Sequence, residues 1–262
     1  MEQNSRLEGV LQGARLPSMP HVLLEIYDLL HSEVAGVEQI VALLESDTGL
    51  AARTLRLANS ACYGRAEPVS RVARAVLRVG PFDLWWLLFT TEVKNLFFGI
   101  DSRLMNMELF WRHSLFTACA SREISGWHQI GRPGDLFVAG LLHDVGKLLL
   151  LQRMPVEYGA LLADTDDAAT LVQRERGEFG FTHAQAGGRL LAHWRMPELL
   201  VAAASRHHDA SPGDGGPAVV ALANRLAHEV LDERPAASPE TVEPALVEAA
   251  QADYEALIGR IL

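Results

Sequence analysis

Apolar residues recur at helical spacing along almost the whole chain, and this periodicity constrains the fold more than any other feature of the sequence. Between residues 19 and 30, one helix face carries Val22, Leu23, Ile26 and Leu29. Alternation of apolar and polar residues rich in β-branched side chains, which is typical of strands, is nearly absent. The sequence therefore predicts an all-α protein.

Capping residues, glycines and prolines separate the predicted helices from one another. In the first half of the chain we expect helices over residues 19–30, 37–45, 50–60, 71–79 and 82–98. In the second half we expect them over residues 107–124, 134–153, 168–178, 182–194, 197–207 and 217–231. A short linker with two prolines, at residues 234–239, precedes a last amphipathic helix that extends to about residue 261.

Charge and cysteine content exclude some classes of function. The chain has 262 residues and a formal net charge of −10. This charge argues against a protein whose main partner is nucleic acid or an anionic membrane, because binding either one needs a cationic face. No apolar run approaches the length that spans a bilayer. Cys62 and Cys119 lie in apolar helical patterns and fit reduced core residues. We therefore expect a cytoplasmic protein.

The run His143-Asp144-Val145-Gly146-Lys147 places three ionisable side chains inside an apolar stretch. Such groups need a partner or an ion, because burying each one unpaired costs several kcal/mol. An imidazole beside a carboxylate is a common pair of ligands for divalent transition metals. The alternative is a buried polar pair without an ion, with Lys147 in a salt bridge to Asp144 at helical spacing.

Four more histidines could complete a metal site. They are His113, His183, His207 and His208, each in or at the end of a predicted helix. Ligands that converge from several helices are a common way to build a metal site inside a bundle. The alternatives are that His183 only begins a helix after Thr182, and that an imidazolium at position 207 or 208 only suits a helix C-terminus. His128 and His228 lack this context.

The chain resembles the HDOD domain, a bacterial signalling relative of the HD superfamily of metal-dependent phosphohydrolases. Its most specific stretch is Leu55-Arg-Leu-Ala-Asn59-Ser-Ala61, in which we interpret Asn59 as structural. The second half contributes Trp111-Arg-His113-Ser114, the run at 143–147, His183-Ala-Gln-Ala-Gly187 and His207-His208-Asp209. The resemblance covers roughly residues 11–231. It implies a multi-helix HD-like bundle at 106–231 with an N-terminal helical subdomain at 11–105, and residues 232–262 would form the linker and last helix.

The resemblance also implies a set of metal ligands. In the HD pattern, His113, His143 and Asp144 match the first three ligands, but Asn224 occupies the position of a distant Asp. A neutral amide is a weaker ligand than a carboxylate, so we expect weakened metal binding.

The related HD-GYP phosphodiesterases imply further site residues, which His183, His207, His208 and Lys147 match. Leu109 takes the place of a Glu in that pattern, and the loop Asp214-Gly-Gly-Pro217 lacks the tyrosine of Gly-Tyr-Pro. The chain thus keeps much of the site and lacks two acidic ligands.

HDOD proteins are generally regarded as regulators, so the resemblance implies a non-catalytic signal-transduction module that binds a signalling protein or a small nucleotide, with a homo-oligomer left open. One alternative is a metal-dependent phosphohydrolase acting on a nucleotide or cyclic dinucleotide, in which Lys147 would hold a phosphate. Another is a divalent metal (Fe, Mn, Mg or Zn) in a partial site without turnover.

Overall fold

The computed structural model describes residues 2–12, 16–60, 63, 67–165, 167–211, 213–231 and 242–261. Throughout these residues the chain forms helices joined by turns and loops, with no strand, so the predicted all-α class is confirmed. Contacts within the chain define two units. The larger unit holds Met1–Leu16, Phe97–Ile258 and Leu262, and the smaller holds Pro17–Leu96 and Gly259–Ile261. The predicted division near residue 105 and the predicted domain end at 231 stay predictions.

The smaller unit contains α2 (His21–Leu30), α3 (Val37–Ser46), α4 (Thr48–Ala58), α5 (Val72–Val79) and α6 (Pro81–Leu96). Helices α2 to α5 each bury one face, whereas α6 is buried all round between Leu84 and Thr90. Trp85 Nε1 donates a hydrogen bond to the Leu23 carbonyl at 2.6 Å. Asn59 follows α4 and bonds both backbone groups of Val69, at 2.7 and 2.8 Å. Its role here is therefore structural, because it ties the end of α4 to the start of the α5 segment.

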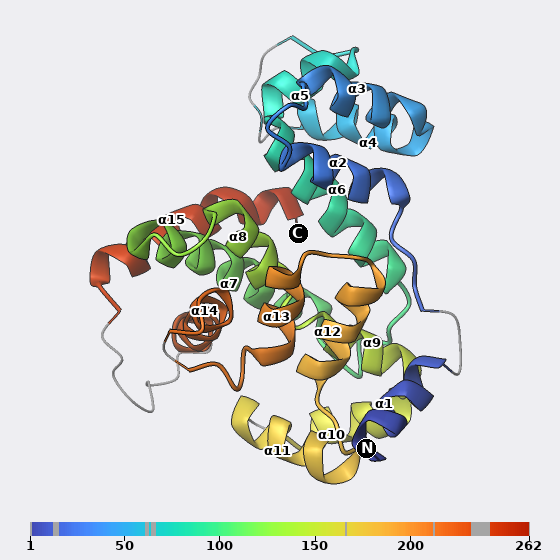
Figure 1. Ribbon diagram of the computed structural model, residues 1–262, viewed down its shortest axis with the longest axis vertical. Coiled ribbons are helices and arrows are strands. Elements are labelled where there is room, and N and C mark those ends of the chain that lie inside the picture. The colour runs from blue at the N-terminus through green and yellow to red at the C-terminus, as the bar shows by residue number, and fades with distance from the viewer. Residues whose placement is uncertain are drawn as a thin grey trace. The chain divides into compact units, whose positions relative to one another are not determined.

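The larger unit carries the remaining helices, except the last three residues of the C-terminal one (Figure 1). They are α1 (Glu2–Gln12), α7 (Met107–His128), α8 (Pro133–Leu142), α9 (Val145–Arg153), α10 (Pro155–Ala163), α11 (Ala168–Glu178), α12 (His183–His193), α13 (Glu198–Arg206), α14 (Gly216–Leu231) and α15 (Pro244–Ile261). The long helix α7 packs against α8 and α14, while α12 packs against α9 and α13.

The single helix predicted over residues 134–153 is wrong, because the structure has two helices there, α8 and α9. Asp144 leaves the helical conformation, with φ −99° and ψ 7°, and begins α9. Apolar residues flank the junction on both sides at spacing that suits one helix, so periodicity did not mark the break at His143-Asp144. Helices α1 and α10 were not predicted either.

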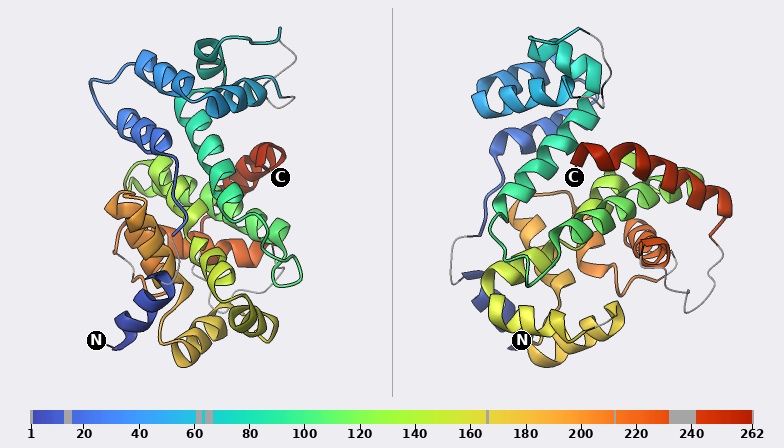
Figure 2. Two further views of the ribbon diagram at one scale, coloured as in Figure 1. Left: turned by 90° about the vertical axis from the view of Figure 1, so that its right-hand side faces the viewer. Right: turned by 180° about the vertical axis from the view of Figure 1, so that it is seen from behind.

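The C-terminal helix α15 packs against α7, as the right-hand view of Figure 2 shows. Arg122 Nε donates to the Asp253 carboxylate at 2.9 Å, and Arg112 Nε donates to the Tyr254 hydroxyl at 3.1 Å. The predicted linker at 234–239 lies outside the described residues. Helix α15 thus packs on α7 through residues 253 and 254 of the larger unit.

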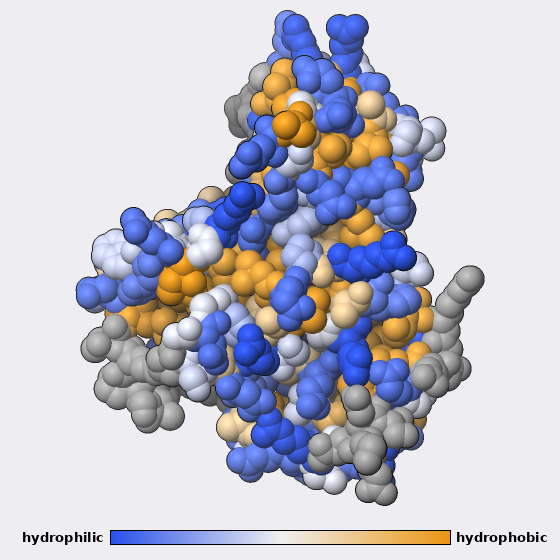
Figure 3. Space-filling model, in the orientation of Figure 1, coloured by the Kyte–Doolittle hydropathy of each residue, from blue (hydrophilic) through white to orange (hydrophobic). Residues whose placement is uncertain are grey.

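Hydrophilic residues are spread over the face seen in Figure 3, with smaller groups of apolar residues among them. None of the helices in the described ranges is both long and apolar enough to cross a bilayer.

Cys119 is buried in α7 as a free thiol, and burial raises its pKa to about 12. Cys62 lies outside the described residues.

Candidate metal centre

The six residues predicted as metal ligands form two groups that share Asp144. In the first, which we call the four-residue group, the ligand atoms of Asp144, His183, His207 and His208 lie within 4.8 Å of one another. In the second, the three-residue group, those of His113, His143 and Asp144 do so. Residues distributed over about a hundred positions of sequence therefore meet inside the larger unit.

Helix ends position these side chains. His143 ends α8, Asp144 begins α9, and His207 ends α13. His183 begins α12 after a capping box, in which the Thr182 hydroxyl accepts from the Gln185 backbone N–H at 3.2 Å and the Gln185 side chain accepts from the Thr182 N–H at 2.9 Å. The site is built at helix termini, where the backbone direction changes and side chains from different helices can converge.

Glycine permits the close crossing of α9 and α12 that brings Asp144 to His183. A Cβ atom added at Gly146 would lie 1.9 Å from the His183 carbonyl oxygen and 2.6 Å from the Gly187 nitrogen. No side chain fits in that space. The glycine of the His-Asp-x-Gly-Lys run therefore has a packing role, whether or not the site binds an ion.

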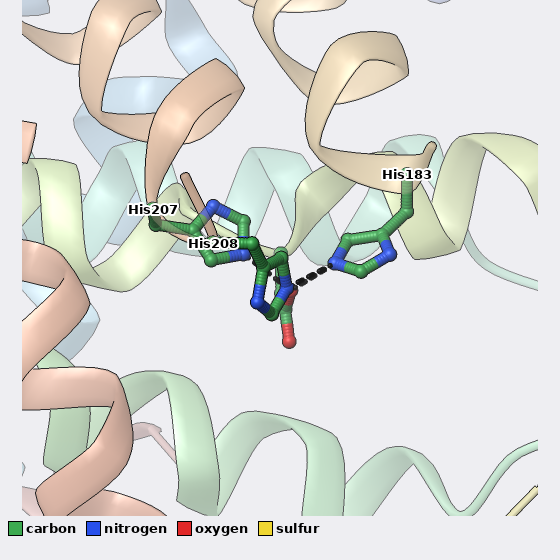
Figure 4. A group of neighbouring side chains, drawn as sticks. His183, His207 and His208 are labelled. Carbon is green, nitrogen blue, oxygen red and sulfur yellow. Dashed lines mark hydrogen bonds and ion pairs between the residues drawn. The ribbon is translucent and has the colours of Figure 1, made fainter. Parts of the chain in front are cut away.

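Three imidazoles are oriented by hydrogen bonds on their outer nitrogen. The Nδ1 atoms of His143 and His207 donate to the carbonyls of Gly140 and Ala204, at 2.7 and 2.8 Å, and that of His183 donates to Glu175 at 2.8 Å. Because these oxygens only accept, each Nδ1 carries the proton. The Nε2 atom of each ring faces inward, and Figure 4 shows His183, His207 and His208 gathered from α12 and the end of α13.

Asp144 lies at the centre of these rings and is only 2% exposed. Its Oδ1 atom is 3.1 Å from His183 Nε2 and 3.5 Å from His207 Nε2. Its Oδ2 atom is 2.5 Å from Lys147 Nζ and 3.4 Å from His143 Nε2. The salt bridge from Lys147 to Asp144 that the sequence offered as an alternative is therefore present.

Charges within the site keep Asp144 ionised. Burial opposes ionisation, but the ammonium group of Lys147, 2.5 Å from Oδ2, holds the pKa of the carboxyl well below its usual value. Burial lowers the pKa of His143 and of His207, so both rings are neutral at pH 7. The site thus presents a carboxylate beside two neutral imidazoles, those of His143 and His207.

These protonation states leave inner atoms without partners. His143 Nε2, His207 Nε2 and Asp144 Oδ1 are buried and have no hydrogen-bond partner. With Nδ1 protonated, each neutral ring turns a lone pair toward an anionic oxygen, which is unfavourable unless a cation lies nearby. Nitrogen and oxygen atoms of this kind are ligands for Fe, Mn and Zn. The residues of the four-residue group therefore fit a divalent metal.

Glu175 is a site residue that the sequence reasoning missed. Its carboxylate is 0% exposed and accepts hydrogen bonds from His183 Nδ1 at 2.8 Å, the His183 backbone N–H at 3.0 Å and the Tyr158 hydroxyl at 2.7 Å. Burial alone would lower the pKa of His183, but Glu175 raises it above the usual value. A carboxylate behind a ligating imidazole is a recurrent feature of metal sites. In the sequence, only its spacing from Leu171 and Val172 pointed to burial, because that spacing puts Glu175 on the apolar face of α11.

In the three-residue group, Asn224 occupies one ring nitrogen of His113. His113 Nε2 donates to Asn224 Oδ1 at 2.8 Å, and the asparagine is 5% exposed. Burial and the nearby His228 lower the pKa of His113 to about 4. The ring of His228 lies 4.5 Å from that of His113, centre to centre, so the structure adds a histidine that lacked a site context in the sequence. Leu109 is 60% exposed and offers no ligand.

Solved structures from several bacteria share this fold. An HDOD domain protein of unknown function from Geobacter sulfurreducens is 25% identical, with a TM-score of 0.71 over 98% of this chain and 89% of that one. A protein provisionally named a phosphohydrolase, from Shewanella amazonensis, is 22% identical, with a TM-score of 0.75 over 99% and 98%. One provisionally named a signal transduction protein, from Marinobacter aquaeolei, is 20% identical, with a TM-score of 0.77 over 99% and 65%.

An uncharacterized protein of Treponema pallidum is 25% identical over 198 residues. The match covers 74% of this chain and 38% of that protein, so the chain spans well under half of this relative's length. The sequence model of the HDOD domain matches residues 16–210, which include all six predicted metal ligands and helices α2 to α6. The chain therefore belongs to the HDOD domain family.

Proposed function

We propose that this HDOD protein is a cytoplasmic regulatory module that acts through binding and holds one divalent metal ion in its four-residue group. The observation that carries the proposal is the pair of unpartnered inner atoms that this group contains, on His207 and Asp144. Family membership and the fold shared with the Marinobacter protein support a role in signalling. We propose a signalling protein or a small nucleotide as the partner, with neither nucleic acid nor membrane.

The absence of turnover is proposed from the three-residue group. Its His113 Nε2 atom donates a hydrogen bond to Asn224 Oδ1, so that nitrogen is committed to the amide and not to a cation. The amide brings no negative charge to offset the charge of a metal ion. A second ion beside His113 would therefore bind weakly, and substrate would lack the charge stabilisation that phosphoryl transfer requires.

The chain's own residues divide the work in the four-residue group. Bound there, a divalent cation would supply a Lewis acid. Asp144 supplies the negative charge, Glu175 fixes the ring of His183, and His183 must lose its Nε2 proton when a cation binds. Lys147, whose side chain is 14% exposed, lies where it can exchange Asp144 for an anionic group of a ligand.

A phosphohydrolase is the second candidate, and Lys147 together with the intact four-residue group favours it. The Shewanella protein shares the fold and is provisionally named a phosphohydrolase. In this reading Lys147 would neutralise phosphate oxygens during hydrolysis of a nucleotide or cyclic dinucleotide.

Assay of metal-loaded protein separates the two candidates. Protein saturated with Mn²⁺, Fe²⁺ or Mg²⁺ is incubated with cyclic dinucleotides and nucleoside triphosphates, and products are separated by chromatography. We expect no turnover above that of the His143→Ala variant. Metal-dependent hydrolysis that disappears in His143→Ala would overturn the regulatory proposal and establish the phosphohydrolase.

A further inference from the structure

Opposite charges are segregated along the sequence of the smaller unit. Residues 17–52 contain six acidic residues and neither lysine nor arginine. Residues 53–78 contain six arginines and a single acidic residue, Glu67. Helices α2 and α3 belong to the first stretch and α5 belongs to the second. The unit therefore has an acidic part and a basic part, and opposite charges of this kind steer two molecules together.

The acidic part contains a groove of about 520 Å³ between α2 and α3, which we call the α2–α3 groove. It is lined by Glu25, Asp28 and Leu29 of α2 and by Gln39, Ala42 and Leu43 of α3. On each helix these residues follow the spacing i, i+3, i+4, so two helix faces form its walls. Asp28 is exposed, and its carboxylate makes no hydrogen bond or ion pair with the residues that the structure describes. Apolar walls with an acidic edge suit a cationic amphipathic helix.

The outer side of α5 has the complementary character. Arg71, Arg74 and Leu77, which we call the arginine ridge, follow one another every three residues. Both arginines are exposed and make no hydrogen bond or ion pair within the described part of the chain. Leu77 is 73% exposed, although it lies in the middle of a folded unit's sequence. The ridge therefore combines two free cations with one large apolar side chain.

The ridge and the groove of one chain cannot meet. Helix α5 packs against α3 and α4 (Figure 1). It does so through its buried side, which carries Val72, Ala75, Val76 and Val79. The ridge on the opposite side therefore points away from α3, which forms one wall of the groove.

We propose that the arginine ridge of one chain docks in the α2–α3 groove of a second copy of this chain. Leu77 would lie against Leu29 and Leu43, and Arg74 beside Asp28. Charge complementarity carries this choice of partner, because the chain itself supplies both a cationic helix face and an acidic groove without bound cations of its own at Asp28. The contact does not depend on metal binding, since neither surface contains a residue of the metal centre.

Sedimentation velocity of the full chain over a series of concentrations tests the proposal. We expect reversible self-association at low ionic strength that weakens as NaCl is added. Arg74→Glu and Asp28→Arg should each raise the dissociation constant at least about tenfold, because each places like charges opposite one another. Both variants should fold, since the first puts an acid in the first turn of α5 and the second a base in the last turn of α2. Melting curves check this.

A mixture of the two variants gives the sharpest result. Arg74→Glu keeps an intact groove and Asp28→Arg keeps an intact ridge, so an equimolar mixture should associate although neither variant does so alone. Arg132→Glu and Glu157→Arg, exposed positions of the larger unit with matched changes of charge, should associate as wild type does. A wild-type chain that stays monomeric at every concentration, association that either reversal leaves unchanged, or a mixture that stays monomeric would overturn the proposal.

Discussion

Glu175 is the single residue on which the geometry of His183 most depends, because it accepts from both the ring and the backbone of that histidine. We expect Glu175→Gln to lower metal affinity by about 10- to 100-fold, the usual effect of losing a partner behind a ligand. Competition with a chromophoric chelator measures this. Glu178→Gln is the matched control, since Glu178 is exposed at the end of the same helix. Equal affinity in both variants would contradict the role given to Glu175.

Asn224 determines how many ions the site holds. Asn224→Asp restores a carboxylate beside His113, so we expect metal content to rise from one ion per chain toward two. Elemental analysis after dialysis against Mn²⁺ or Fe²⁺ provides the count. Asn106→Asp is the control, because Asn106 caps α7 and aspartate caps a helix equally well. A count unchanged by Asn224→Asp would show that the amide does not limit the three-residue group.

The residues of the site differ in how far the sequence could predict them. His143 and Asp144 stand out because ionisable groups in an apolar run need an explanation, and the family pattern adds the other histidines. Glu175 and His228 belong to no such run, and only tertiary packing brings them to His183 and His113. The metal role of all these residues remains a prediction.

The crossing of α9 and α12 depends on Gly146, where an added Cβ would collide with the backbone of α12. We expect Gly146→Ala to destabilise the protein by about 1–3 kcal/mol, as overpacking of a close contact does, and to displace His183. Urea denaturation gives the free energy of unfolding. Gly177→Ala in α11 is the control: its Cβ meets nothing within 4 Å, so the change should stabilise by about 0.5–1 kcal/mol. Equal stability of the Gly146→Ala variant and wild type would refute this packing role.

Periodicity predicted the helices well, because most of them bury one face against neighbours. The observed α11 spans the predicted 168–178, and α3 and α14 each differ from prediction by one residue at one end. Periodicity failed at the junction between α8 and α9, since both flanks are apolar and the break arises from the site geometry at Asp144. Packing of α15 on α7 through Arg122 and Asp253 joins residues too distant in sequence for any local pattern to pair.

For the whole molecule, the neutral buried histidines predict a stability that depends on pH in the metal-free protein. The pKa values of His113, His143, His207 and His208 are all lowered, mainly by burial. In the unfolded chain these rings take up protons near pH 6.5, so the unfolded state binds more protons and stability falls as pH drops from 6.5 toward 4. His183, whose pKa is raised, loses its contribution only above that window.

Urea denaturation of chelator-treated protein at a series of pH values tests this dependence. The free energy of unfolding should decrease steadily from pH 6.5 to 4, and His113→Asn should make the decrease shallower. Below about pH 4.5, protonation of Glu175 and then Asp144, whose pKa values are lowered in the fold, adds to the loss. A flat profile between pH 6.5 and 4.5 would mean that these rings are not buried in the neutral form.

The number of divalent ions retained per chain tests the metal centre most directly. Untagged protein is stripped with chelator, reconstituted with Mn²⁺, Fe²⁺ or Zn²⁺, dialysed, and measured by elemental analysis beside His207→Asn and the control His193→Asn, an exposed histidine at the end of α12. We expect about one ion per chain in wild type and His193→Asn, and almost none in His207→Asn. Wild-type protein that retains no ion after reconstitution would contradict the proposal that the four-residue group binds a metal.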